Sequence, residues 1–310
     1  MKTIDIICVG EILIDFIGHE INTSINKTKD YHRFLGGSPT NVAVNASRIG
    51  LKPILVASCG QDGLGDYIVR KLKSNNLDVN FIKKISDLPT SIILVSKSTE
   101  TPDFIPYRQA DCEITINQLP DDMIQNAKIF HTTCFALSKD PARKTILDRA
   151  KKAKDFGLKL SIDLNYSERI WPNREEAKTV IKDYLKNDPL LKISEDDCFR
   201  FFDELKSESF IFNYFHNLGV STICLTKGRN GVVVSDINQG LFYQEAENIQ
   251  QIKDTTGAGD AFWTGFLYAQ IKGKDIKKSL TIAQKLASIK LQSIGRLPEN
   301  INLEEIIKSI

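Results

Sequence analysis

Histidine and cysteine are scarce in this sequence, and neither residue type forms a metal-binding pattern. The chain has four histidines in 310 residues, and they are scattered rather than set at the spacing of metal ligands. Its six cysteines stand at positions 8, 59, 112, 134, 198 and 224, without a CxxC pair and mostly within apolar segments. They are therefore predicted to be buried free thiols rather than zinc ligands or members of a disulfide framework.

The chain also lacks a strong excess of one charge and any long hydrophobic run. Its net charge is only +2, and Lys and Arg form no extended block, so a dedicated nucleic-acid-binding role is not expected. No stretch of about 20 apolar residues is present, which argues against a membrane span. Residues 1–10 include Asp5 and lack the apolar core of a signal peptide, so a first strand of a cytoplasmic protein is predicted.

Hydrophobic residues are plentiful enough, at 42%, to build a sizeable core. Short β-branched runs alternate with helical patterns, which is typical of an α/β fold with a mainly parallel central sheet and helices on both faces. Strands are expected at 4–9, 12–17, 54–58, 127–131, 158–163, 190–193, 222–226 and 232–235. A single domain, 1–310, is expected, with helices at 40–49, 64–74, 141–156, 174–186, 195–206 and 208–218.

Two regions, 12–35 and 88–110, interrupt this alternation with strand-like runs that no helix separates. Strands without helices to cover them often form a small sheet of their own. We therefore expect a β-sheet lid that projects from the main domain, with residues 97–102 as a loop within it. An exposed edge strand of such a lid is able to pair with a second copy, which suggests a homodimer.

The most informative segment is Asp254-Thr-Thr-Gly-Ala-Gly-Asp-Ala-Phe-Trp-Thr-Gly-Phe-Leu267. Gly257, Ala258 and Gly259 are able to expose successive backbone N–H groups at a helix start, where the helix dipole also favours an anion. Asp260 stands at the edge of this cradle, where a carboxylate is costly unless it takes a proton from an attacking hydroxyl. The alternative is a plain turn with Asp260 in the first turn of the helix, and local chemistry does not decide between the two.

A second glycine cluster, Gly36-Gly-Ser-Pro-Thr-Asn41, leads into an expected helix. Gly36 and Gly37 permit close backbone approach, and Asn41 offers both a donor and an acceptor, which is a combination suited to a sugar. Asp15 follows an apolar run at the end of a strand, where its carboxylate is placed to accept two adjacent hydroxyls. The alternative for Asp15 is an ordinary turn residue. The alternative for the glycine cluster is a plain helix start that Ser38 or Thr40 caps.

Two polar turns follow strands in the second half of the chain. The first, Thr226-Lys-Gly-Arg-Asn-Gly231, is either a hairpin with Asn230 and Gly231 in a type I′ turn or a lining for a nucleotide phosphate. The second, Ser194-Glu-Asp-Asp197, is either a capped helix N-terminus or a place where Asp197 holds Mg²⁺ through water. Residues 60–65 have the spacing GxxGxG, and GxxxxGK[ST] does not occur, so Rossmann and Walker-type sites are not expected.

The two glycine segments, 36–41 and 254–267, together resemble the signature motifs of the ribokinase-like (PfkB) carbohydrate kinases, and the resemblance extends over essentially the whole chain. It implies a central sheet with helices on both sides and a β-lid over the sugar. It also implies that the protein phosphorylates a small-molecule sugar with ATP and Mg²⁺. Under this resemblance Asp260 is the catalytic base, and Gly257, Ala258 and Gly259 form the anion hole for the transferred phosphoryl group.

The resemblance also implies roles for other residues. The implied sugar contacts are Asp15, Gly36, Gly37, Asn41, Tyr107, Arg108 and Asp260. The implied nucleotide contacts are Lys192, Ser194, Thr226, Lys227, Gly228, Gly231, Gly257 and Gly259. Asp197 stands where the family usually has a Glu that organises magnesium waters, and Ser194 stands where many members have Asn. A site for K⁺ near Asp254 and Thr256 is implied by the resemblance alone.

The sugar itself is indicated by two further segments. Residues 104–108 resemble a lid segment of fructokinases, 2-keto-3-deoxygluconate kinases and 5-dehydro-2-deoxygluconate kinases, and residues 163–171 resemble a segment that these subgroups share. Ser167 stands where they typically carry Arg, which weakens the case for an acidic sugar, so fructose is the leading expectation. A nucleoside kinase and a non-catalytic sugar-sensing protein on the same fold are the remaining alternatives.

Overall fold

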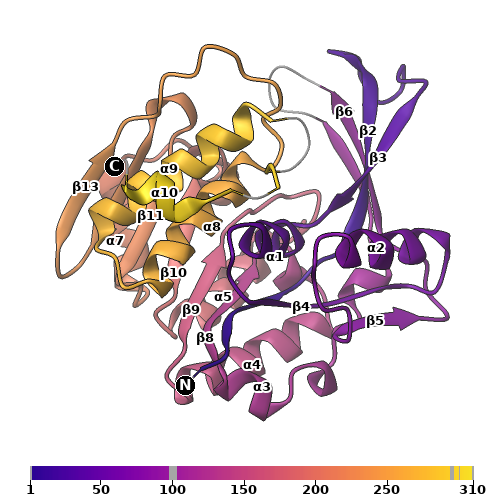
Figure 1. Ribbon diagram of the computed structural model, residues 1–310, viewed down its shortest axis with the longest axis horizontal. Coiled ribbons are helices and arrows are strands. Elements are labelled where there is room, and N and C mark those ends of the chain that lie inside the picture. Colours follow the sequence, from indigo (N-terminus) through magenta and orange to yellow (C-terminus); the bar gives the residue numbers. More distant parts are fainter. Residues whose placement is uncertain (1, 98–102, 294–296, 300, 309–310) are drawn as a thin grey trace.

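Two β-sheets organise the chain, whose computed structural model describes residues 2–97, 103–293, 297–299 and 301–308. Figure 1 shows the small sheet standing to one side of the helices and strands that make up the rest of the molecule. The predicted loop at 97–102 lies, apart from Lys97, outside the described residues.

The large sheet has nine strands, in the order β13 (Gly240–Gln244), β12 (Val232–Asp236), β11 (Thr222–Thr226), β10 (Leu190–Ser194), β9 (Lys159–Asp163), β8 (Ala127–Thr133), β1 (Ile4–Val9), β4 (Pro53–Gly60) and β5 (Ile82–Ile85). It is parallel from β5 to β11 and antiparallel at β12 and β13. Every predicted strand of this sheet is confirmed, whereas β5 and β13 were not predicted. The carboxyl ends of its parallel strands meet at one edge, where open α/β sheets bind ligands.

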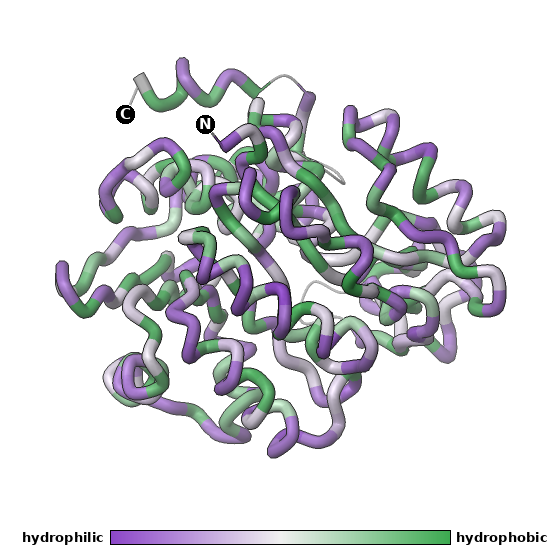
Figure 2. The backbone as a smooth tube through the Cα atoms, turned by 90° about the horizontal axis from the view of Figure 1, so that it is seen from below, coloured by the Kyte–Doolittle hydropathy of each residue, from purple (hydrophilic) through white to green (hydrophobic). Residues whose placement is uncertain are grey.

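Helices cover both faces of the large sheet, as predicted. Successive residues of a strand point to opposite faces, so Ile6 and Cys8 of β1 enter one core and Ile7 and Val9 enter the other. The first core is closed by α1 (Ser38–Arg48), α2 (Gly63–Lys73), α8 (Ala258–Ile271), α9 (Ile276–Leu291) and α10 (Leu303–Lys308). The second is closed by α3 (Asp121–Gln125), α4 (Ala142–Asp155), α5 (Arg174–Leu185), α6 (Glu195–Phe202) and α7 (Glu208–Asn217). Figure 2 shows hydrophobic and hydrophilic stretches alternating along the outer helices, which is the pattern of elements with one buried face.

The small sheet has four strands, in the order β3 (Tyr31–Gly36), β2 (Leu13–Ile21), β6 (Ile92–Lys97) and β7 (Phe104–Tyr107). Its existence confirms the prediction of a separate sheet built from the two segments that lack helices. Asp15 of β2 pairs with Phe34 on one side and with Ile93 on the other, so these three side chains share one face. This face therefore carries Asp15, one of the predicted sugar contacts.

The cysteine prediction is confirmed, because all six cysteines are buried free thiols. Among the helices of the described residues, none is both long enough and apolar enough to cross a membrane. The predicted helix at 195–206 ends early, at Phe202, because Asp203 adopts a left-handed conformation with φ of 64°.

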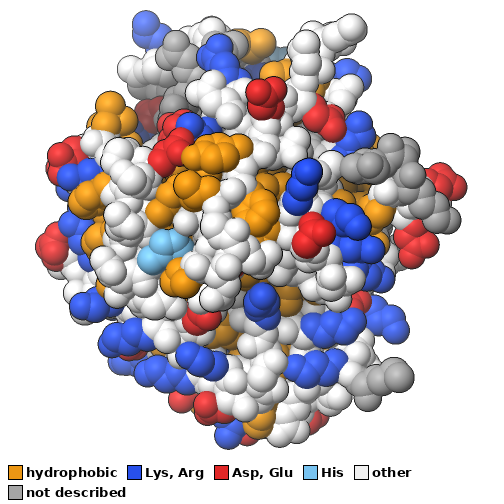
Figure 3. All heavy atoms as spheres, turned by 90° about the vertical axis from the view of Figure 1, so that its left-hand side faces the viewer, with side chains coloured by type: hydrophobic (Ala, Val, Ile, Leu, Met, Phe, Trp, Pro, Cys, Tyr) orange, Lys and Arg blue, Asp and Glu red, His pale blue; other side chains and the backbone are white. Residues whose placement is uncertain are grey.

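The β13 end of the large sheet is an open edge. Figure 3 shows this face, on which hydrophobic side chains gather among charged ones. Leu241 and Tyr243 of β13 are 54% and 65% exposed, and Ile237 in the preceding turn is 58% exposed. The strand is only five residues long, which limits pairing with another chain along this edge.

Helices α8 and α9 approach each other closely at Gly265, where a Cβ would lie 2.8 Å from Ala283 Cα and 3.1 Å from Ile282 O. Gly265→Val is expected to lower the free energy of unfolding by about 1–3 kcal/mol, because the helices would have to separate. Urea denaturation measures this loss. Gly63→Val in α2 is the matched control, since a Cβ there would meet no heavy atom within 4 Å outside its own helix and chain neighbours. Equal losses in the two variants would contradict close helix packing as the cause.

Candidate active site

Asp260 lies where the N-terminal ends of α1 and α8 meet. Gly37 precedes α1 with φ of 102°, and Gly257 precedes α8 with φ of 77°. The hydroxyl of Ser38 donates to Asp260 Oδ1 at 2.6 Å, and the amide of Asn41 donates to Asp260 Oδ2 at 2.8 Å. The two glycine segments predicted to carry function are therefore in direct contact, although 219 residues separate Asn41 from Asp260.

The protonation of Asp260 depends on opposing influences. Burial raises the pKa of Asp260, whereas the hydrogen bonds from Ser38 and Asn41 and the positive charges of Lys192 and Lys290 lower it, and burial prevails. A carboxylate with a raised pKa holds a proton more strongly, which makes it a better general base near neutral pH. Asp260 is also in the first turn of α8, which is the position that the alternative interpretation gave it.

A second carboxylate, Asp15, belongs to the small sheet and lines a cavity that Asn41 and Gly257 also line. Burial, reinforced by the negative charge of Asp260, raises the pKa of Asp15 to about 7. Gly36 packs directly against this carboxylate, because a Cβ there would lie 2.3 Å from Asp15 Oδ2 and would force the Asp15 side chain to shift. Gly37 is equally constrained, since a Cβ there would lie 2.2 Å from the backbone oxygen of Glu11.

Glu11 organises the turn before α1, and no sequence motif singled it out. Its side chain is 2% exposed; Oε1 accepts from the Ser38 N–H at 3.0 Å, and Oε2 accepts from the Thr133 hydroxyl at 2.8 Å. The Thr40 hydroxyl donates to the Glu11 carbonyl at 3.1 Å. Ser38 and Thr40 therefore do not cap α1, so the capping alternative is wrong at this helix. Burial raises the pKa of Glu11 to about 8.

A buried ion pair lies beneath the glycine cradle. Lys192 of β10 and Asp163 of β9 are neighbours in the sheet, and Lys192 Nζ donates to both Asp163 oxygens at 2.8 Å. A Cβ at Gly259 would lie 3.5 Å from Lys192 Nζ, so this ammonium stands next to the N-terminus of α8. Burial opposes its charge, but the negative charges of Asp163, Asp197 and Asp260 together with the hydrogen bond to Asp163 outweigh burial, so the pKa of Lys192 is raised. The helix dipole and this ammonium together favour an anion at the cradle.

The Ser194–Asp197 turn is a capped helix N-terminus. The Asp197 N–H donates to Ser194 Oγ at 3.0 Å, and the Ser194 N–H donates to Asp197 Oδ2 at 3.1 Å, which forms a capping box for α6. Asp197 also lines the cavity, and its Oδ1 accepts from Arg200 at 2.5 Å. Within the part of the chain that the structure describes, no group of three or more His, Cys, Asp or Glu is placed to hold a metal ion.

The hairpin between β11 and β12 differs from its prediction. A 3-10 turn at Gly228–Asn230 connects the strands, and the positive φ values belong to Gly228 and Gly231, at 53° and 85°. The predicted type I′ turn at Asn230 and Gly231 is therefore wrong. The strand register sets Thr226 opposite Ser194, which brings together two predicted nucleotide contacts. Lys227 forms an ion pair with Glu208 at 2.6 Å.

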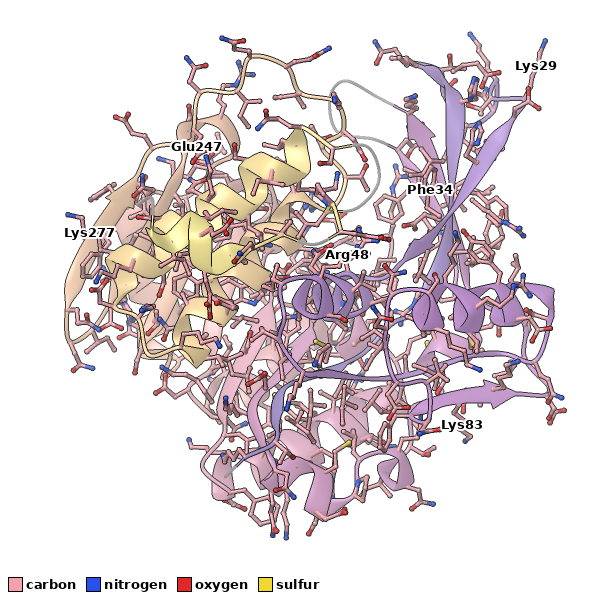
Figure 4. The ribbon with its side chains drawn as sticks, viewed as in Figure 1. Lys29, Phe34, Arg48, Lys83, Glu247 and Lys277 are labelled. Carbon is pink, nitrogen blue, oxygen red and sulfur yellow. The ribbon has the colours of Figure 1, made fainter. Side chains whose placement is uncertain are left out.

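A cavity of about 1470 Å³ opens between the small sheet and the large sheet. That volume exceeds the roughly 300–1,000 Å³ of a typical small-molecule site, so it has room for two substrates. Asp15, Asn41, Thr256 and Gly257 are among its lining residues. Phe34 and Arg48 reach it from β3 and α1, as Figure 4 shows.

Two predicted sugar contacts lie elsewhere. Arg108 is 7% exposed; its guanidinium pairs with Asp111 at 2.6 Å, donates to Ser138 and lies 4.1 Å from the centre of the Phe135 ring. Tyr107 belongs to β7, in which Phe104 lines the cavity. Because alternate side chains of a strand point to opposite faces, Tyr107 is on the outer face, where it is 53% exposed. The sequence predicted the strand that contains Tyr107, but not which of its side chains point into the cavity. It also did not reveal that Arg108 pairs with residues inside the protein.

Comparison with known proteins agrees with this geometry. The profile described as pfkB family carbohydrate kinase matches residues 3–300. The chain is 32% identical over 305 residues to an ATP-dependent 6-phosphofructokinase of Thermoanaerobacterium thermosaccharolyticum, which covers 98% of this chain and 93% of that protein. It matches the solved fructokinase of Halothermothrix orenii with a TM-score of 0.80 and 32% identity, over 92% and 98% of the two chains. It matches an uncharacterized sugar kinase of Pyrococcus horikoshii in complex with ATP with a TM-score of 0.84 and 28% identity, over 98% and 97%.

Fold and comparisons together define an ATP-dependent sugar kinase. The chain belongs to the pfkB family of carbohydrate kinases. The ribokinase-like fold class predicted from the glycine motifs is thereby confirmed.

The raised pKa of Glu11 predicts how stability changes with pH. Folded Glu11 keeps its proton up to about pH 8, whereas an unfolded glutamate loses it near its ordinary value of 4.5. The contribution of Glu11 to the free energy of unfolding is therefore fully present below pH 4.5 and is lost as the pH rises towards 8. The loss is at most about 1.4 kcal/mol per pH unit. Glu11→Gln keeps the shape of the side chain but does not titrate. Between pH 5 and pH 8 the free energy of unfolding of this variant is therefore expected to fall by on the order of 1–3 kcal/mol less than that of the wild type.

Urea unfolding at several pH values measures this difference. Glu305→Gln, an exposed substitution in α10, is the matched control and should follow the wild-type pH dependence. An unchanged slope in Glu11→Gln would show that Glu11 is ionised in the folded protein.

Proposed function

We propose that the enzyme transfers the γ-phosphoryl group of Mg-ATP to a hydroxyl of a six-carbon ketose with the fructose skeleton. The observation that carries the proposal is the Asp260 carboxylate, which Ser38 and Asn41 hold beside the glycine-rich N-terminus of α8. The names of two relatives at 32% identity, a 6-phosphofructokinase and a fructokinase, support the fructose skeleton.

In the proposed mechanism Asp260 orients the acceptor hydroxyl and takes its proton. The backbone N–H groups of 257–259 face the transferred phosphoryl group, and the Lys192 ammonium beneath Gly259 adds positive charge at the same point. Phosphoryl transfer asks little covalent chemistry of a protein, so fixed donors and fixed charges of this kind supply most of the rate enhancement. The small sheet would act as a lid that covers the acceptor and excludes water, which otherwise competes for the phosphoryl group.

Magnesium fits the described donors only through water. Asp197 faces the cavity, but Ser194 and Arg200 already donate to its oxygens. Mg²⁺ commonly keeps several waters and binds substrate phosphates with one or two carboxylates. When bound in this way, it would neutralise charge on the phosphates of ATP. Asp197 would then orient waters of the ion rather than coordinate it directly.

Fructose is the first proposed acceptor, and fructose 6-phosphate is the second. Three basic side chains of the small sheet, His19, His32 and Lys97, line the cavity, and they would suit a phosphate at the far end of the sugar. His19 Nδ1 lies 2.9 Å from His32 Nε2, so the two rings form one group. The 6-phosphofructokinase at 32% identity favours the same acceptor.

Asp260→Asn is expected to lower kcat for the best acceptor by about 10²–10⁴-fold, because the amide cannot take the proton of the hydroxyl. Release of ADP from Mg-ATP measures this across fructose, fructose 6-phosphate, ribose, 2-keto-3-deoxygluconate, 5-dehydro-2-deoxygluconate and adenosine. Asp66→Asn is the matched control, since Asp66 is also in the first turn of a helix but is 56% exposed. Tight sugar binding without turnover in the wild type would favour a sugar sensor instead.

Lys97→Met is expected to raise KM for fructose 6-phosphate about tenfold and to leave KM for fructose unchanged, since it removes one charge-assisted hydrogen bond to phosphate. Steady-state kinetics with both acceptors measure the difference. Lys29→Met is the matched control, because Lys29 lies at the far tip of the small sheet, as Figure 4 shows. Equal changes for the two sugars would exclude a phosphate site at Lys97.

A further inference from the structure

A buried lysine lies beneath the loop that leads into the glycine cradle. Lys290 belongs to the last turn of α9, and its side chain is only 3% exposed. Its ammonium donates to the backbone oxygen of Asp254 at 3.3 Å and pairs with Asp254 Oδ2 at 3.2 Å. A buried helix position ordinarily carries an apolar side chain, because burying a charge is costly unless it is paired and hydrogen-bonded. The contact with Asp254 therefore has to offset that cost.

The same aspartate fixes the loop that precedes α8. Asp254 Oδ1 accepts from the Thr256 N–H at 2.9 Å, and the Lys253 N–H donates to the Leu291 oxygen at 2.8 Å, at the end of α9. Lys290 Cε lies 3.8 Å from the point that a Cβ on Gly257 would occupy. The ammonium, the carboxylate and the end of α9 thus hold the chain where it enters the cradle.

The potassium ion expected near Asp254 and Thr256 does not fit this arrangement. Such an ion would take its ligands from the oxygens of Asp254, and two of these oxygens already accept from Lys290. A potassium ion bound to the same oxygens would lie close to the Lys290 ammonium. The two positive charges would repel each other, because little water is present to screen them. The Lys290 ammonium already places one positive charge beside Asp254.

We propose that Lys290 is a positioning residue that takes the place of a monovalent cation, so that the kinase reaches its full rate without potassium. The proposal rests on the proposed function, in which the N–H groups of 257–259 receive the transferred phosphoryl group. Holding Asp254 and Thr256 keeps these groups in the orientation that the reaction needs. A misplacement of about 1 Å at a reacting centre costs about 10²-fold in rate, so a fixed loop has a large effect.

The first experiment compares the wild type in choline chloride and in potassium chloride at equal ionic strength. The expected result is a kcat that differs by less than about twofold between the two salts, because the Lys290 ammonium already provides the charge. Activation by potassium of tenfold or more would overturn the proposal, and this comparison needs no variant.

The second experiment uses Lys290→Ala, which removes the ammonium and opens space beside Asp254. In choline chloride its kcat is expected to fall by about 10²-fold, and potassium or ammonium ions are expected to restore at least part of the loss. Lys285→Ala is the matched control, since Lys285 also belongs to α9 but is 41% exposed and pairs with Glu247. A loss that neither cation reverses, in a folded variant, would show that Lys290 is only a packing residue and would overturn the proposal.

Thermal unfolding provides a readout that does not depend on catalysis. Potassium is expected to raise the Tm of Lys290→Ala relative to choline and to leave the Tm of the wild type unchanged. If Lys290→Ala does not fold, Lys290→Gln takes its place in both measurements. If no acceptor is phosphorylated, the proposed function fails, while the Tm comparison still decides whether the ammonium replaces a cation. A potassium-dependent rise in the wild-type Tm would overturn the replacement.

Discussion

The structure depends on one set of hydrogen bonds, in which Ser38 and Asn41 of α1 donate to the carboxylate of Asp260 in α8. These bonds join the starts of two helices that are far apart in the sequence. The segment before α1 is constrained in addition by other contacts: a Cβ on Gly36 would meet the Asp15 carboxylate, a Cβ on Gly37 would meet the backbone oxygen of Glu11, and Glu11 Oε1 accepts from the Ser38 N–H. A carboxylate fixed in this way needs no further reorganisation before it meets a hydroxyl, which is the condition for efficient catalysis.

The balance of charge around this carboxylate is the second constraint. Burial raises the pKa of Asp15, and the negative charge of Asp260 raises it further. Lys192 and Lys290 approach from below the cradle and favour the ionised form of Asp260. Each ammonium is buried with its own aspartate, Asp163 for Lys192 and Asp254 for Lys290. Positive charge therefore lies under the cradle in fixed positions, where a phosphoryl group would develop negative charge.

Much of the fold was predictable because it follows from local patterns. Alternating strand and helix periodicities located the strands of the parallel sheet, and two segments without helices marked the small sheet. The errors came from positions where local chemistry has two solutions. Asn230 and Gly231 suit a type I′ turn, but a 3-10 turn closes the hairpin. Ser38 suits a helix cap, but its hydroxyl donates to Asp260 instead. In the case of Ser38 the hydrogen-bond partner is far away in the sequence, and the residues around Ser38 give no information about it.

The sequence by itself determined the α/β class, the family and the two glycine segments, because spacing and residue type are local properties that survive in the unfolded chain. Tertiary structure alone decided that Asp260 is held by Ser38 and Asn41, that Arg108 is paired internally, and that Lys290 is paired with Asp254. Each of these depends on a contact between segments or on the facing of a side chain. Burial then sets what a charge costs, and burial exists only once the chain has folded.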